Sequence, residues 1–282
     1  MQVKNRSSVK KVTIPGTSIS FGEESQLTVI AGPCVIESED SALRHAEKIS
    51  EIAREQNVAY VFKASYDKAN RSSHKSYRGP GLEEGIKILK KVKDTFDLPV
   101  LSDVHSCEEL EVAGDILDII QIPAFLSRQT DLLQAAAKTG KVVNVKKGQF
   151  LAPWDMKNII EKIEDAGNEN ILLTERGVSF GYNQLVSDFR AIPIMRDLGY
   201  PVVFDATHSV QQPGGLGTVS GGKSEFIPTL AKCGVVSGAD ALFFEVHENP
   251  KEALSDGPNA FPLEQFAEML DVCKRLREVV TE

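Results

Sequence analysis

Short apolar runs recur eight times along this chain, and a segment with helical periodicity follows each of them. The runs cover residues 27–31, 58–62, 99–102, 118–122, 142–145, 171–174, 202–204 and 241–244. The helical segments cover residues 41–55, 82–96, 108–114, 130–139, 155–166, 182–198, 220–234 and 263–280. The runs are rich in Val and Ile without clean polar alternation, which is typical of strands buried on both faces. Strict alternation of such strands with helices requires parallel pairing, so the pattern predicts a (β/α)8 TIM barrel of the α/β class.

The chain length of 282 residues agrees with one barrel domain. Residues 1–26 precede the first run and are mostly polar, although 12–14 and 18–20 are suited to pair as a short β-hairpin. We therefore expect an N-terminal arm over 1–26 and a catalytic barrel over 27–282.

Composition excludes several classes of function. A net charge of −8 and a pI near 5.3 argue against a general nucleic-acid binder. No stretch approaches the roughly 18 apolar residues of a membrane span. The four cysteines are widely spaced and form no CxxC pair, which indicates neither a disulfide framework nor a zinc ribbon. We expect a cytoplasmic protein with no nucleic-acid or membrane partner.

The segment 60–81 is long and cationic. It begins in an apolar run and then carries Lys63, Lys68, Arg71, Lys75 and Arg78 before Gly79-Pro80-Gly81. Residues 70–73, of sequence NRSS, offer amide, guanidinium and hydroxyl donors in succession, which suits the many oxygen acceptors of a sugar phosphate. A solvated surface loop is the plainer alternative, but the pattern favours a clamp for an anionic substrate.

Barrel enzymes carry their catalytic groups where strands end and the following loops begin. In this chain every predicted strand ends next to polar residues. In chain order they are Cys34; Lys63; Asp103 and His105; Gln121 and Arg128; Lys146 and Lys147; Glu175 and Arg176; Asp205 and His208; and Glu245 and His247. These side chains are therefore expected at one rim of the barrel.

The rim residues separate into two chemical sets. The cations Lys63, Lys68, Arg71, Lys146 and Arg176 suit substrates that carry phosphate and carboxylate groups. The second set combines a thiol, an imidazole and two carboxylates, which is a mixed ligand set for a divalent metal. Its members are Cys34, His208, Glu245 and Asp256. Their spacing alone leaves open that Cys34 is only a small buried residue. The glycines at 214–217 leave open a phosphate-binding turn, a flap over His208 or a plain turn.

Several segments resemble the 3-deoxy-D-manno-octulosonate 8-phosphate synthase family. They are AGPC at 31–34 with Glu37-Ser38, FKASYDKANRSS at 62–73, QIPAFLSRQTDLL at 121–133, NVKKGQFLAPWD at 144–155, TERG at 174–177 and DATHSVQQPGG at 205–215. The resemblance extends from about residue 27 to the last helix. It implies a (β/α)8 barrel, usually tetrameric, that condenses phosphoenolpyruvate with arabinose 5-phosphate for lipopolysaccharide biosynthesis.

The resemblance also implies a role for each matching residue. Catalytic roles fall on Lys63, Lys68, Asp103, Lys146, Arg176 and His208, and phosphoenolpyruvate is expected against Lys63, Ser65, Lys68, Lys146 and Arg176, with Gln121 and Asp103 nearby. Asn70, Arg71 and Ser72 are expected to hold arabinose 5-phosphate. Arg128 matches an arginine that reaches a neighbouring subunit's site, which implies a homotetramer.

The resemblance implies that the residue at position 34 distinguishes a metal-dependent from a metal-free branch of the family. The metal-free branch has Asn at this position, whereas this chain has Cys34. Cys34, His208, Glu245 and Asp256 match the ligands of the metal-dependent branch, which implies a divalent ion such as Zn²⁺, Fe²⁺ or Mn²⁺. The sequence Asp256-Gly257-Pro258-Asn259 departs from that branch and resembles the metal-free one.

Two rival functions remain at this stage. One is the sister synthase that uses erythrose 4-phosphate, whose sugar loop resembles KPRTS, whereas this chain has KANRSS at 68–73. The other is a non-catalytic barrel that binds a phosphosugar.

Overall fold

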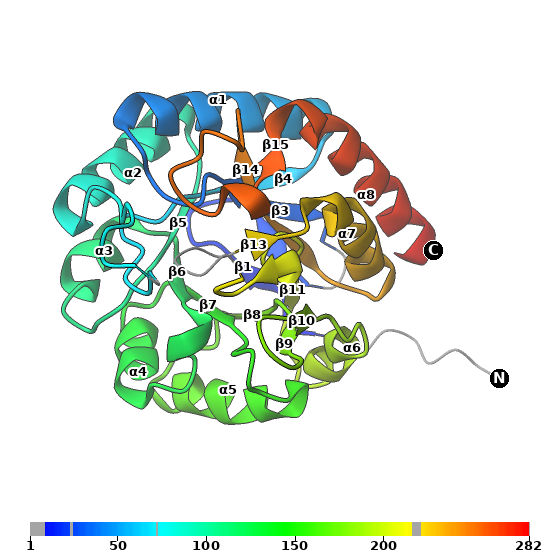
Figure 1. The fold of residues 1–282 in the computed structure, drawn as a ribbon. Helices are drawn as coiled ribbons and strands as arrows, with labels where there is room; N and C mark the ends of the chain where they lie inside the picture. Colours follow the sequence, from blue (N-terminus) through cyan, green and yellow to red (C-terminus); the bar gives the residue numbers. More distant parts are fainter. Residues whose placement is uncertain (1–8, 23–24, 72, 216–220, 282) are drawn as a thin grey trace.

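A closed parallel barrel forms the centre of the molecule (Figure 1). The computed structural model describes residues 9–22, 25–71, 73–215 and 221–281. Within these residues the barrel strands are β3 (Thr28–Gly32), β4 (Ala59–Lys63), β5 (Val100–Asp103), β6 (Ile119–Ile122), β7 (Val142–Lys146), β8 (Ile171–Glu175), β11 (Val202–Asp205) and β14 (Ala241–His247). Each strand pairs in parallel with the next, and β14 pairs with both β11 and β3. The predicted (β/α)8 barrel is confirmed.

Helices surround the barrel and cover the outer face of its strands (Figure 1). They are α1 (Glu39–Glu55), α2 (Leu82–Phe96), α3 (Leu110–Ile116), α4 (Thr130–Lys138), α5 (Met156–Asp165), α6 (Ala191–Arg196), α7 (Ile227–Val236) and α8 (Phe266–Thr281). Local sequence sets their starts: the Ser38 side chain, for example, accepts a hydrogen bond from the Ser41 backbone N–H at 3.1 Å and caps α1.

The barrel interior changes character along its axis. The part nearer the amino ends of the strands is apolar. It contains Ile30, Val61, Leu101, Ile119, Val142, Leu172, Val203, Ala241 and Phe243, all fully buried. The inward-facing side chains nearer the carboxyl ends are polar, as in Lys63, Asp103 and Glu245. The carboxyl end therefore offers chemically active groups to a ligand.

The N-terminal hairpin packs against the apolar part of the barrel. Strands β1 (Val12–Thr13) and β2 (Ser20–Phe21) are antiparallel, with Val12 opposite Phe21, which confirms the predicted hairpin. Val12, Ile14 and Phe21 are buried in the same cluster as the interior side chains. The hairpin thus closes the amino-terminal end of the barrel and leaves the opposite end for the site.

Two predicted helices differ from the structure. The helix expected at 182–198 is wrong in its first half, because β9 (Val178–Ser179) and β10 (Leu185–Val186) form a hairpin there and only α6 is helical. Gly181 and Asn183 have φ values of +74° and +55°, which a continuing helix does not allow.

The helix expected at 220–234 begins later than predicted. Strand β13 (Gly221–Gly222) and a 3₁₀ turn (Ser224–Phe226) precede α7, while residue 220 lies outside the described residues. The proline of α7 lies in its first turn, where the missing N–H has no cost.

No helix in the described residues combines the length and the apolar composition that crossing a bilayer requires.

Candidate active site

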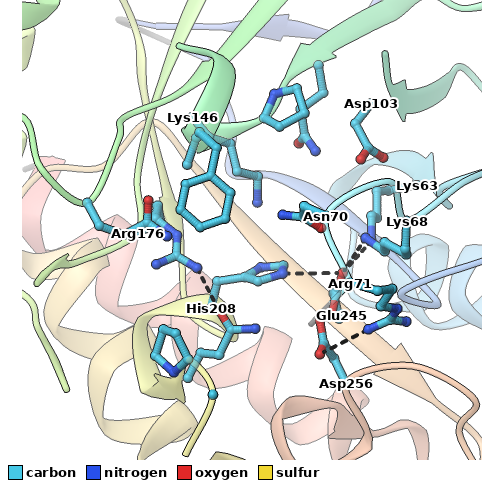
Figure 2. A pocket seen from close by; sticks show the side chains of 18 of the residues that line it. Lys63, Lys68, Asn70, Arg71, Asp103, Lys146, Arg176, His208, Glu245 and Asp256 are labelled. Atoms are coloured by element: carbon cyan, nitrogen blue, oxygen red, sulfur yellow. Dashed lines mark hydrogen bonds and ion pairs between the residues drawn. The ribbon is translucent and has the colours of Figure 1, made fainter. Parts of the chain in front are cut away.

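A cavity of about 180 Å³ opens at the carboxyl end of the barrel strands (Figure 2). Most of the residues predicted for the site line it: Lys63, Lys68, Asn70, Arg71, Asp103, Gln121, Lys146, Arg176, His208, Glu245 and Asp256. They come from seven different strands or the loops that follow them. The structure therefore brings together cations and carboxylates that are distant in sequence.

Four predicted residues are placed differently. Cys34 and Ser65 are buried behind the wall of the cavity, where each contacts a lining carboxylate. Arg128 is exposed and does not line the cavity of its own chain. Ser72 lies outside the described residues, as do residues 216–217 of the glycine segment.

Lys63 and Glu245 form an ion pair at the centre of the site. The Lys63 Nζ atom lies 2.5 Å from Glu245 Oε1 and also donates to the carbonyl oxygen of Cys34 at 3.0 Å. Lys68 Nζ approaches the same carboxylate oxygen at 3.8 Å. Burial alone would raise the pKa of Glu245, but Lys63, His208 and Lys68 hold it well below its usual range.

Asp205 anchors two functional side chains, a role that the sequence pattern did not reveal. Its carboxylate accepts a hydrogen bond from Lys146 Nζ and contacts His208 Nδ1 at 2.7 Å. Lys146 Nζ also lies 3.4 Å from the ring centroid of Phe243, a cation–π contact. Burial lowers the pKa of Lys146 to about 8 although Asp205 opposes this shift. Lys146 is thus a cation that is held firmly but weakly solvated.

Arg176 directs part of its guanidinium toward the cavity. Its Nη2 atom donates to Gln211 Oε1 at 2.9 Å, whereas the buried Nη1 atom has no hydrogen-bond partner among the described residues (Figure 2). An unsatisfied buried donor is costly unless a ligand completes it. Nη1 is therefore available to an anionic oxygen. Gln211 was missed as a supporting residue because it follows the strand by several positions.

The described part of the cationic segment 60–81 lies beside the cavity and is held by internal contacts. Arg71 Nε donates to the Tyr77 carbonyl oxygen at 3.1 Å, and Arg71 Nη1 lies 3.6 Å from Asp256 Oδ1. The Tyr77 hydroxyl donates to the Ile36 carbonyl oxygen at 2.9 Å. The buried Arg71 Nη2 atom has no hydrogen-bond partner among the described residues. This loop presents Asn70 and Arg71 to the same cavity as Lys146 and Arg176.

Three of the predicted metal ligands form one group. One ligand atom each from Cys34, Glu245 and Asp256 lies within 4.8 Å of the others. His208 is adjacent, since its Nε2 atom lies 3.5 Å from Glu245 Oε1 (Figure 2). The Asp205 contact at Nδ1 orients the ring. Burial and the charge of Glu245 raise the pKa of the Cys34 thiol.

A family model described as the DAHP synthetase I family matches residues 2–282. The chain belongs to this family. A "2-dehydro-3-deoxyphosphooctonate aldolase" of Geobacter sp. (strain M21) is 56% identical over 97% of this chain and 99% of its own length. A protein of the same name from Trichlorobacter lovleyi is 58% identical over 93% of this chain and 97% of its own length. A third, from Geotalea uraniireducens, is 56% identical over 96% of this chain and 99% of its own length.

In this member of the DAHP synthetase I family, a chain of contacts surrounds Asp103. Ser65 donates to its carboxylate, and His105 Nε2 lies 3.2 Å from Asp103 Oδ2. Glu109 Oε2 lies 3.3 Å from His105 Nδ1 and accepts a hydrogen bond from the Tyr66 hydroxyl at 2.5 Å. Glu109 and Tyr66 were not predicted, because neither directly follows a strand.

These contacts determine the charge around Asp103. Burial opposes protonation of His105, but its contacts with Asp103 and Glu109 raise its pKa to about 10. Burial would raise the pKa of Asp103, yet Lys68 and His105 keep it well below its usual range. At neutral pH Asp103 is therefore an anion beside two cations. It is better suited to accept hydrogen bonds than to remove a proton.

The Asp256-Gly257-Pro258-Asn259 segment of this family member links two loops. Asp256 has φ +50°, and a Cβ atom at Gly257 would lie 2.4 Å from the Pro250 carbonyl oxygen, so glycine is required there. Asn259 is fully buried, and its Nδ2 atom lies 3.4 Å from the Gly221 carbonyl oxygen. This segment thus holds the loop after β14 against β13.

Proposed function

We propose that this chain condenses phosphoenolpyruvate with D-arabinose 5-phosphate and water. The products are 3-deoxy-D-manno-octulosonate 8-phosphate, a precursor of lipopolysaccharide, and inorganic phosphate. The observation that carries the proposal is the convergence of Lys63, Lys146 and Arg176 with Asn70 and Arg71 on one cavity. Relatives that are 55–58% identical share the name 2-dehydro-3-deoxyphosphooctonate aldolase, which supports this reaction.

The cations of the cavity suit the anionic groups of both substrates. Arg176 Nη1 and Lys146 Nζ neutralise phosphoenolpyruvate, while Asn70 and Arg71 receive the sugar phosphate. This arrangement holds C3 of phosphoenolpyruvate against the aldehyde carbon of the sugar, which removes much of the entropic barrier to carbon–carbon bonding. The electron pair of the C2–C3 double bond forms the new bond, and the aldehyde oxygen takes up one proton of the attacking water and becomes the hydroxyl of the product.

Water then adds to the electron-deficient C2 and gives a tetrahedral phosphohemiketal. Asp103 lines the cavity and accepts a hydrogen bond from this water, which orients one of its lone pairs toward C2. Collapse of the tetrahedral centre breaks the bond between C2 and the bridging oxygen, so phosphate leaves with that oxygen. The C2 hydroxyl gives its proton to the departing phosphate, and C2 becomes a ketone. The cations that held the substrate phosphate also stabilise the departing anion.

We further propose that a divalent ion binds to Cys34, His208, Glu245 and Asp256. The donor set fits such an ion, because it combines a thiol, an imidazole and two carboxylates in one small volume. The buried Glu245 Oε2 atom also has no hydrogen-bond partner among the described residues, so it is available as a ligand. When bound, the ion would supply a Lewis acid to an oxygen in the cavity.

The products and the bond that breaks test the condensation. With phosphoenolpyruvate that carries a heavy oxygen isotope at the bridging position, we expect the label in the released phosphate. We also expect an eight-carbon sugar acid phosphate by mass spectrometry. A label retained in the sugar acid would contradict attack of water at C2.

Arg71→Ala is expected to raise KM for arabinose 5-phosphate roughly 10- to 150-fold and KM for phosphoenolpyruvate much less. Loss of a charge-assisted hydrogen bond costs about 1.5–3 kcal/mol. Arg71 lines the cavity and belongs to the segment 60–81, which we propose holds the sugar phosphate. Arg78→Ala is the matched control, because Arg78 is an exposed arginine of the same loop that pairs with Asp67. Steady-state kinetics with each substrate varied would show the split. Equal increases in both KM values would refute the assignment of Arg71 to the sugar.

We propose a homotetramer in which Arg128 reaches the site of a neighbouring subunit. Arg128 is exposed and absent from its own cavity, which agrees with a role in another subunit. Large aromatic side chains are exposed on the loops after β6, β7 and β8, namely Phe125, Phe150, Trp154, Phe180 and Tyr182. Exposed aromatic residues at the rim are suited to an interface between subunits.

Mixing Arg128→Ala subunits with Lys146→Ala subunits is expected to restore activity that neither variant has alone. In mixed oligomers some sites combine an intact Lys146 with an intact Arg128 from the neighbour. Two differently tagged variants, co-purified and assayed for phosphate release, provide the measurement. Mixed oligomers that remain as inactive as the separate variants would show that sites are not shared.

We place the reaction in the cytoplasm. The four cysteines are free thiols, and Cys34 must stay reduced to act as a ligand.

A further inference from the structure

Ser255 lies at the sulfur of Cys34, although no motif or metal-ligand pattern singles it out. Its Oγ atom is 2.6 Å from Cys34 Sγ, and the two residues are separated by 221 positions in the chain. Their exposed fractions are 4% and 5%. Among the described residues the structure records no other hydrogen-bond partner for the Ser255 side chain.

The backbone around Ser255 is fixed on both sides. The preceding Leu254 N–H donates to Glu37 Oε1 at 2.7 Å, and Glu37 Oε2 lies 3.4 Å from His247 Nε2. On the other side Asp256 takes a left-handed conformation, and the close approach of Gly257 to Pro250 locks the turn. These backbone contacts on both sides of Ser255 therefore fix the position of its hydroxyl next to the sulfur.

We propose that Ser255 is a positioning residue whose hydroxyl donates a hydrogen bond to the Cys34 sulfur and tunes it as a metal ligand. The proposal rests on the proposed metal site. A thiolate and two carboxylates together carry more negative charge than a divalent ion neutralises. A hydroxyl donor at the sulfur withdraws electron density from it and fixes its direction toward Glu245 and Asp256. Donors to metal ligands typically affect metal affinity 10- to 100-fold.

Cobalt substitution separates this role from simple packing. Co²⁺ bound to a thiolate gives a sulfur-to-metal charge-transfer absorption band, whose energy depends on hydrogen bonding to the sulfur. In Ser255→Ala we expect this band to move to longer wavelength, because the sulfur electrons are no longer stabilised by the donor. In competition with a chelator, we expect Co²⁺ to be held about 10- to 100-fold more weakly.

Ser50→Ala is the matched control, since Ser50 is a buried serine of α1 whose hydroxyl donates to the Glu47 carbonyl oxygen. It should leave band and affinity unchanged. A Ser255→Ala protein with the wild-type band and affinity would overturn the proposal. A wild type without any sulfur-to-cobalt band would overturn the Cys34 ligand assignment and this inference with it. The condensation would then still be judged separately by its products.

Discussion

Replacing Lys146 with methionine is expected to lower kcat/KM for phosphoenolpyruvate by roughly 100- to 1,000-fold. The substitution keeps most of the side-chain length but removes the charge that neutralises the substrate. It also leaves the fully buried Asp205 carboxylate without its Lys146 partner. Removing one preorganised charge that stabilises the reacting groups costs about 100- to 1,000-fold in rate. The broken buried ion pair with Asp205 instead lowers the stability of the fold, which a thermal melt detects.

Steady-state kinetics and a thermal melt together check this prediction. Lys90→Met is the matched control, because Lys90 is an exposed lysine on α2 that pairs with Asp94 in its own helix. The control should retain wild-type kinetics. A folded Lys146→Met enzyme with kcat/KM within a few-fold of wild type would show that Lys146 does not stabilise the reacting groups.

Removal of the proposed metal is expected to abolish activity, and added divalent ion should restore it. Cys34→Asn should lose tightly bound metal while the fold stays intact, because Asn is close in size to Cys and an amide is a much poorer ligand. Some turnover that resists chelator is expected to survive in Cys34→Asn, since the metal-free branch of the family has Asn at this position.

Elemental analysis and activity with and without chelator provide the measurement. Cys233→Ser is the control, as Cys233 is a partly buried free cysteine on α7 outside the ligand group. It should keep both metal and activity. If purified wild type proved metal-free and fully active in chelator, the ligand role of Cys34, His208, Glu245 and Asp256 would fail together.

The strands were predictable because a strand that is buried on both faces needs a short run of mainly apolar residues, which is visible in the sequence. Runs such as 142–145 and 171–174 are mainly apolar, and β7 and β8 are found there. The stretch 182–198 was not predictable from periodicity alone. Its first part is a hairpin that depends on left-handed backbone at Gly181 and Asn183. A turn of this kind produces no regular spacing of apolar residues in the sequence.

The site was predictable to the extent that its residues lie at the carboxyl ends of strands or directly after them. Lys63, Asp103 and Lys146 are the last residues of β4, β5 and β7, and all three line the cavity. Supporting contacts obey no such rule, because they depend on which loops meet in space. Ser255 reaches Cys34 across 221 positions of sequence, and spacing carries no signal for a contact of that kind.

Phosphate release from phosphoenolpyruvate with each of two aldose phosphates tests the proposed function most directly. The cavity joins the cations for phosphoenolpyruvate with Asn70 and Arg71, and the sugar loop has the sequence KANRSS at 68–73. We predict rapid release with arabinose 5-phosphate and little release with erythrose 4-phosphate. Faster release with the four-carbon sugar would assign the chain to the sister reaction. Binding of both substrates without release from either would identify a barrel that holds phosphosugars but does not join them.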